Sequence, residues 1–259
     1  MEHKRGWQVF NYTVVRAFPE GKMMDKDQSI EDGISLREAM YSARAMRWLK
    51  PDPVAPELIK RILEAAIQAP NAGNRQSWLF MVVRDVEQRR RIGAIYHRVS
   101  LWVLQRYQHQ TRPAYQSQAE YDRMMSGGVH LYEHMGDAPV LLIPCLRINL
   151  VELPAEIPAD VRSAMREAFP WTAGASIYPA VQNIILACRA LGLGTVLTTN
   201  HTIAENEIKE VLGLPSEVRT FALMPIGYPE RSFGPVKRRP LAEVAMIDRY
   251  GSQFNGNSF

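Results

Sequence analysis

Three short apolar runs, each bounded by polar or turn-forming residues, place the strongest constraint on the fold. They cover residues 79–83, 139–146 and 221–226, and a shorter run of the same kind covers residues 195–198. Apolar runs of this length are typical of strands buried in a sheet. Longer segments with helical spacing of apolar residues lie between them. The order of these segments predicts a domain that mixes helices and strands.

Helices are predicted from apolar spacing and from capping residues. Ser35 with Glu38, and Thr202 with Glu205, fit the capping box, in which each side chain bonds a free backbone N–H group of the first turn. A pattern of this kind predicts that a helix begins at the serine or threonine. The expected helices cover residues 35–42, 56–69, 86–108, 176–191 and 202–212.

The chain shows no repeat and no linker, so we expect one domain over residues 34–259, ending in a C-terminal tail rich in Pro and Arg. Residues 1–33 have no periodicity and are interpreted as an N-terminal arm. Residues 97–170 are rich in Tyr, Gln and Arg, and their pattern gives no firm assignment for much of their length. We treat them as a variable region.

Composition excludes several classes of protein. Hydrophobic residues make up 46% of the 259 residues, which indicates a sizeable core, and the net charge is only +4. The basic runs at 89–91 and 237–239 lack interleaved aromatic residues, so we expect no nucleic-acid partner. No apolar run is long enough to span a bilayer, and no membrane partner is expected. Cys145 and Cys188 stand singly in apolar stretches, which is typical of inert thiols in a reducing cytoplasm.

One short motif suggests a metal. His130 and His134 belong to an HxxEH pattern, which on a helix would place two imidazoles on one face. A zinc peptidase needs a third ligand, and the sequence offers no clear acidic partner. We therefore treat zinc as a remote alternative and expect no metal site. The sequence also lacks GxGxxG, GxxxxGK[ST] and GxSxG motifs.

Four segments carry residues suited to an anionic, planar ligand. Arg44 and Arg47 follow the first expected helix, and the 237–239 run supplies further cations for a phosphate. The loop 69–78 is rich in amides, which can both donate and accept hydrogen bonds to a polar ring edge. Gly194 opens a strand and lacks a side chain, so a flat ring could approach its backbone closely. These residues by themselves indicate an anion-binding protein.

The same segments are similar in order and spacing to the FMN-dependent nitroreductase superfamily. The stretches that carry the resemblance are residues 43–85, beginning ARAMRWLKPDPV, residues 174–199, GASIYPAVQNIILACRALGLGTVLTT, and residues 222–244, ALMPIGYPE to KRRPLAEV. The resemblance implies an α+β three-layer sandwich in which helices flank a central, mainly antiparallel sheet. It also implies an intertwined homodimer with FMN bound at the subunit interface.

Positions matched to the family imply roles for single residues. Arg44, Ala45 and Arg47 would contact the FMN phosphate and ring edge, and Lys237 with Arg239 would complete the phosphate site. The remaining implied cofactor contacts are Pro70, Asn71 and Ala72 from the partner subunit, Asn74 and Gln76 at the ribityl chain or ring, and Leu197, Thr198 and Thr199 near N5. This chain departs from the family at Ala43, Asn71 and Ser77, where relatives often have a basic residue, Ser and Pro.

The activity implied is ping-pong transfer of hydride from NADH or NADPH to a small organic acceptor such as a nitroaromatic, without a catalytic acid or base from the protein. The same scaffold is also used for reductive dehalogenation or enoate reduction. A flavin-binding protein without turnover is a further alternative. Aromatic residues of the variable region, including Trp102, Tyr107, Tyr115 and Tyr121, could form a lid or could simply be surface or dimer contacts.

Overall fold

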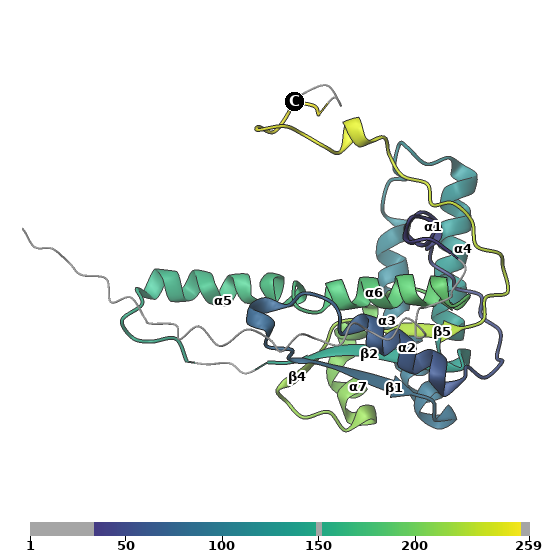
Figure 1. The fold of residues 1–259 in the computed structure, drawn as a ribbon, viewed down its shortest axis with the longest axis horizontal. Coiled ribbons are helices and arrows are strands. Elements are labelled where there is room, and N and C mark those ends of the chain that lie inside the picture. Colours follow the sequence, from purple (N-terminus) through teal and green to yellow (C-terminus); the bar gives the residue numbers. More distant parts are fainter. Residues whose placement is uncertain (1–33, 149–151, 255–259) are drawn as a thin grey trace, which may run out of the picture. The chain divides into compact units, whose positions relative to one another are not determined.

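A computed structural model describes residues 34–148 and 152–254 (Figure 1). The predicted arm 1–33 lies outside the described residues. The sheet has the strand order β1-β2-β5-β3, with β4 paired to β2, and every pairing is antiparallel. Its strands are β1 (Trp78–Val83), β2 (Val140–Arg147), β3 (Gly194–Thr195), β4 (Val218–Thr220) and β5 (Met224–Gly227).

Helices form most of the remaining described residues. Helix α3 has the bounds that the sequence predicted, and in α6 Pro179 lies in the first turn as expected. The α-helices are α1 (Leu36–Ser42), α2 (Pro56–Ala66), α3 (Val86–Gln108), α4 (Gln118–His134), α5 (Ala159–Gly174), α6 (Tyr178–Ala190) and α7 (Glu205–Leu212). Short 3₁₀ turns are η2 (Ala72–Asn74), η3 (Met135–Asp137), η4 (Asn200–Ala204) and η5 (Leu241–Glu243).

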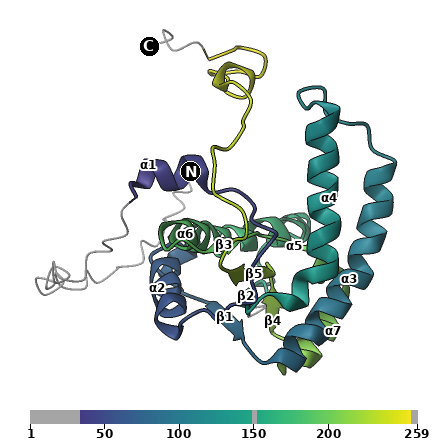
Figure 2. The same cartoon turned by 90° about the vertical axis from the view of Figure 1, so that its right-hand side faces the viewer.

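The two faces of β2 bury two separate cores, which makes the fold a three-layer sandwich. Val140 and Leu142 pack in a cluster with α2 and α6. Leu141, Ile143 and Cys145 pack in a second cluster with α3, α4 and α7. Strand side chains alternate between faces, so a fully apolar strand requires helices on both sides. Figure 2 shows α2 and α6 on one side of the sheet and α3, α4 and α7 on the other, which confirms the predicted α+β sandwich.

The strand predicted at 221–226 begins too early: β4 ends at Thr220, before this range, and β5 begins only at Met224. The break between the two strands lies opposite a proline of β2. Thr220 pairs with Cys145 and Met224 pairs with Leu142, but the ladder is interrupted between them. Pro144 has no backbone N–H, so it accepts a bond from Phe221 without returning one. The predicted buried strand at 79–83 is also corrected: β1 is an edge strand, and only Val83 is fully buried.

The predicted capping boxes differ from those observed. The box at 202–205 is wrong, since η4 occupies this segment and the Glu205 carboxylate instead accepts from Arg219 Nε and the Thr220 backbone N–H, each at 2.7 Å. The Ser35 hydroxyl does accept from the Glu38 N–H, but the Glu38 side chain pairs with Arg189. A complete box lies at Ser117–Glu120, where α4 begins.

The helices of the described residues include none that is both long and apolar enough to cross a membrane. The variable region 97–170 contains the end of α3, all of α4 and β2, and most of α5. Both cysteines are buried and free, and burial raises the pKa of the Cys145 thiol to about 12. The prediction of inert thiols agrees with this burial.

Candidate functional site

The segment that carries the two predicted arginines is fixed to the end of the sheet. The Met46 N–H donates to the Thr195 carbonyl at 3.0 Å, and the Glu230 N–H donates to the Trp48 carbonyl at 3.0 Å. A Cβ atom on Gly194 would lie 2.9 Å from Met46 Cβ, closer than carbon atoms approach without displacement. Gly194 therefore permits close approach of the chain's own loop.

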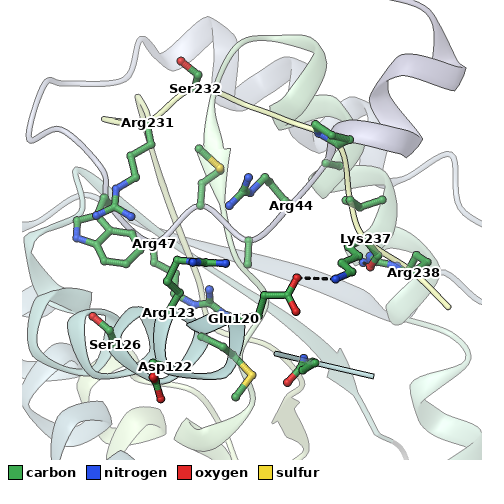
Figure 3. A pocket seen from close by; sticks show the side chains of 18 residues that line it. Arg44, Arg47, Glu120, Asp122, Arg123, Ser126, Arg231, Ser232, Lys237 and Arg238 are labelled. Carbon is green, nitrogen blue, oxygen red and sulfur yellow. Dashed lines mark hydrogen bonds and ion pairs between the residues drawn. The ribbon is translucent and has the colours of Figure 1, made fainter. Parts of the chain in front are cut away.

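This segment forms one wall of a pocket of about 900 Å³. Helix α4 and the segment 231–238 form the other walls, so the pocket combines three parts of the chain that are distant in sequence. Four of the predicted cofactor contacts line it: Arg44, Ala45, Arg47 and Lys237. Figure 3 shows the Arg44, Arg47 and Arg123 side chains pointing into the space between these walls.

The charges in the pocket are unevenly paired. Lys237 Nζ lies 2.5 Å from Glu120 Oε1, and this hydrogen bond, with those from Ser117, lowers the pKa of the Glu120 carboxyl to about 2. Burial lowers the pKa of the Arg47 guanidinium, and the neighbouring charge of Arg44 lowers it further. Within the described residues neither arginine has an ion-pair partner, so an anion entering the pocket would find two uncompensated guanidiniums.

The predicted amide-rich loop lies at a different place in the chain's structure. Asn71 and Ala72 line a second pocket of about 270 Å³, together with residues of α5 and the end of β2. Asn71 Oδ1 accepts from the Gln76 N–H at 2.8 Å, and the Asn74 and Gln76 amides lie 3.3 Å apart. One chain therefore does not bring these residues, or the exposed Pro70 at the start of the loop, to the pocket of Arg44 and Arg47.

Residues 197–199, the contacts expected near N5, pack beside a buried tyrosine that the sequence analysis did not single out. Thr198 Oγ1 lies 2.8 Å from the Tyr96 hydroxyl, and burial raises the pKa of Tyr96 to about 12. Leu197 and Thr199 on either side are exposed. None of the three lines either pocket. Tyr96 was not recognised because it falls on the apolar face of α3, where spacing indicates only core.

Arg239 also lies away from the first pocket. Its guanidinium is 5.8 Å from the centre of the Tyr115 ring, and the neighbouring Arg238 lines the pocket instead. The structure thus brings together Lys237 with the two arginines of the first segment, but it does not place Arg239 with them.

The HxxEH histidines have packing roles. His130 stacks on Trp48, with 4.6 Å between ring centres, and His134 Nδ1 lies 2.8 Å from Asp137 Oδ2. Burial lowers the pKa of His130, and the neighbouring His134 adds to this effect. The part of the chain that the structure describes holds no group of three His, Cys, Asp or Glu side chains able to bind a metal.

The fold and these segments are similar to those of known proteins. The family model described as the nitroreductase family matches residues 40–228, which is most of the chain. The chain belongs to the nitroreductase family. The match includes Arg44, Arg47 and the 70–76 loop and ends before Lys237. The segment 231–238, which forms one wall of the first pocket, therefore lies outside the family match.

Relatives within the nitroreductase family carry more than one enzyme name. A protein named NADH dehydrogenase from Thermus thermophilus is 28% identical over 232 residues, which cover 82% of this chain and 96% of that protein. Iodotyrosine deiodinase 1 from Rattus norvegicus is 22% identical over 238 residues, covering 91% of this chain and 74% of that enzyme.

Solved structures show the same fold. A BluB-like flavoprotein from Clostridium difficile superposes with a TM-score of 0.63 at 21% identity, covering 84% of this chain and 100% of that one. Oxidised iodotyrosine deiodinase bound to FMN and 3-iodo-L-tyrosine superposes with a TM-score of 0.59 at 20% identity, with the same coverage. The sandwich described above is therefore the nitroreductase fold.

Proposed function

We propose that this chain binds FMN non-covalently and passes electrons from NADH or NADPH to a small organic acceptor. The observation that carries the proposal is the meeting of Arg44, Arg47 and Lys237 around one pocket. The pocket volume, about 900 Å³, lies within the range of small-molecule sites, roughly 300–1,000 Å³. Its cations suit a phosphate, so the residues fit FMN, which when bound supplies the hydride chemistry.

The three cations have distinct roles in the proposal. Arg44 and Lys237 would hold the phosphate by charge-assisted hydrogen bonds, which requires Lys237 to share or leave Glu120. Arg47 is more buried than Arg44 and lies deeper in the pocket wall. In that position it would attract negative charge on a bound ring, because a partly desolvated cation is weakly screened. No acid or base from the protein is required.

A second copy of the chain would complete the site. Helix α5 exposes Val161, Met165 and Phe169 at intervals of four residues, so they form an apolar stripe along one face. Trp171 is 85% exposed on the same helix. A stripe of this kind indicates a contact with another protein surface. We propose a homodimer in which the partner's amide-rich loop approaches the pocket of the arginines.

Spectroscopy of the purified protein tests this proposal. We expect flavin absorption bands, or their appearance when FMN is added, and bleaching of these bands when NADPH or NADH is added without oxygen. The Arg44→Gln variant should bind FMN more weakly, while Arg91→Gln, which removes an exposed charge from α3, should not. A colourless protein that does not take up FMN would refute the proposal. Flavin that no nicotinamide reduces would indicate storage of FMN without turnover.

Reductive dehalogenation is the second candidate, because the rat iodotyrosine deiodinase matches 91% of the chain. In this reaction a carbon–iodine bond is replaced by a carbon–hydrogen bond and iodide leaves, with two electrons from the reduced cofactor and a proton from solvent. Iodide release from 3-iodotyrosine, compared with the loss of a nitroaromatic under the same conditions, distinguishes the two. We place either reaction in the cytoplasm, where buried free thiols remain reduced.

A further inference from the structure

One face of α4 points at the segment that contains Arg44 and Arg47. Glu120, Arg123 and Gly127 are spaced at three and four residues, so they lie along the same side of the helix. A Cβ atom on Gly127 would lie 3.2 Å from Trp48 Cη2 and 3.3 Å from Arg47 Nη1. This face is therefore in contact with the segment, and Arg123, one turn earlier, extends into the pocket (Figure 3).

A second arginine is held beside the same tryptophan. The Arg231 guanidinium carbon lies 3.7 Å from the centre of the Trp48 ring, a cation–π contact. Trp48 also stacks on His130 with an interplanar angle of 13°. Because both neighbours constrain the indole ring, the direction of the Arg231 side chain is constrained too. Arg123 and Arg231 thus reach the pocket from α4 and from the segment after β5.

The pocket has more positive charge than an FMN phosphate needs. Its two acids have partners already, since Glu120 is bonded to Lys237 and the Asp122 carboxylate accepts from Gln118 Nε2 at 2.8 Å. Across the described ranges, Arg123 has neither an ion pair nor a hydrogen bond. Arg231 has no ion pair either, and its interactions are the contact with Trp48 and the electrostatic effect of its charge on His130. A phosphate monoester carries at most two negative charges, which Arg44 and Lys237 would balance in the proposed site, while Arg47 faces the ring.

We propose that Arg123 and Arg231 form a second anion subsite that selects an electron acceptor bearing a carboxylate, such as an aromatic acid. This inference rests on the proposed function. A guanidinium binds a carboxylate in the plane of its paired N–H donors, and the indole of Trp48 offers an aromatic surface beside it. Arg123 belongs to the variable region, where the family resemblance places the choice of substrate.

Matched acceptors test the subsite in the FMN-loaded enzyme. 4-Nitrobenzoate and 4-nitrobenzamide differ chiefly in charge, so the ratio of their kcat/KM values reports recognition of the carboxylate. Arg123→Gln and Arg231→Gln should each lower this ratio about tenfold, the effect of losing one charge-assisted hydrogen bond. Arg91→Gln removes the same charge from an exposed site on α3 and should leave the ratio unchanged.

Binding without turnover gives a second readout. Benzoate and benzamide cannot accept electrons, and their dissociation constants can be measured from perturbation of the flavin spectrum. Both variants should weaken benzoate about tenfold and leave benzamide unaffected. Equal changes for charged and neutral compounds would overturn the subsite. If the variants changed only the ratio of the activities with NADPH and with NADH, the assignment of the subsite to the acceptor would be overturned. Failure to reduce either acceptor, with normal benzoate binding, would refute the proposed activity and keep the subsite.

Discussion

Two adjacent glycines in α4 allow a test of the contact between this helix and the segment that contains Arg44 and Arg47. A Cβ atom on Gly127 would meet Trp48 and Arg47 at 3.2–3.3 Å, tighter than ordinary van der Waals contact. A Cβ atom on Gly128 would meet only the end of the Tyr132 side chain, the hydroxyl at 3.6 Å and Cζ at 3.8 Å, which are ordinary contacts. Gly127→Ala and Gly128→Ala therefore make the same chemical change in the same helix, but only the first crowds the site.

The expected difference follows from two opposing effects. Replacing a glycine by alanine inside a helix stabilises the fold by about 0.5–1 kcal/mol, and this gain is common to both variants. Crowding a packed contact costs about 1–3 kcal/mol. Because each neighbour of Gly127 must move by only a few tenths of an ångström, the lower half of that range applies, about 1–2 kcal/mol. Gly128→Ala should therefore be the more stable variant by this amount.

The difference is measurable in two assays. For a domain of this size it corresponds to a gap of about 2–8 °C in Tm between the two apoproteins. If the strain is relieved by displacing Arg47, the Kd for FMN should rise about five- to thirtyfold in Gly127→Ala relative to Gly128→Ala. Equal Tm and equal FMN affinity in the two variants would refute the close packing of α4 on the segment that contains Arg44 and Arg47.

Three further changes should have measurable effects. Tyr96→Phe leaves the Thr198 hydroxyl unpaired, which should cost about 1 kcal/mol in urea unfolding. Because burial raises the pKa of Tyr96 to about 12 from 10.0, wild-type stability should fall between pH 10 and 12, and the variant should lose less. Burial lowers the pKa of His201 to about 4 from 6.5, so at acid pH the unfolded chain binds a proton that the folded chain excludes. The free energy of unfolding should therefore drop by about 2–3 kcal/mol from pH 7 to 4.5. Urea unfolding of His201→Leu at both pH values should show this loss removed. Glu120→Gln should free Lys237 and tighten FMN binding about two- to fivefold in a flavin fluorescence titration, and a weaker affinity would contradict competition between Glu120 and the phosphate.

Local signals in the sequence were sufficient where the element depends on its own residues. Helix α3 begins after Asp85, whose side chain accepts from the Gln88 N–H, and its bounds were predicted correctly. The start of the strand predicted at 221–226 was wrong, because the break before β5 is caused by Pro144 in a different strand. The periodicity of a segment carries no information on the hydrogen-bonding groups of the strand that pairs with it in the folded sheet.

The same distinction separates the predicted and unpredicted parts of the candidate site. Arg44, Arg47 and Lys237 were found from residue type and from the family resemblance, and the structure gathers them around one pocket. Arg123 was not found, because α4 is polar and its spacing does not indicate a ligand-binding face. The Ser117–Glu120 capping box was the one local signal for this helix, and it would have placed Arg123 in the first turns.

Asn71, at a position where relatives often have serine, has a structural role in the amide-rich loop. Asn74 and Gln76 both have positive φ, 49° and 50°, a conformation that non-glycine residues adopt at a cost. The Asn71 side chain reaches across the turn to accept from the Gln76 N–H at 2.8 Å. A serine, which relatives often have at this position, is shorter by one heavy atom in reach and is less able to span the turn. Asn71 therefore stabilises a strained loop, which the partner subunit would contact in the proposed homodimer.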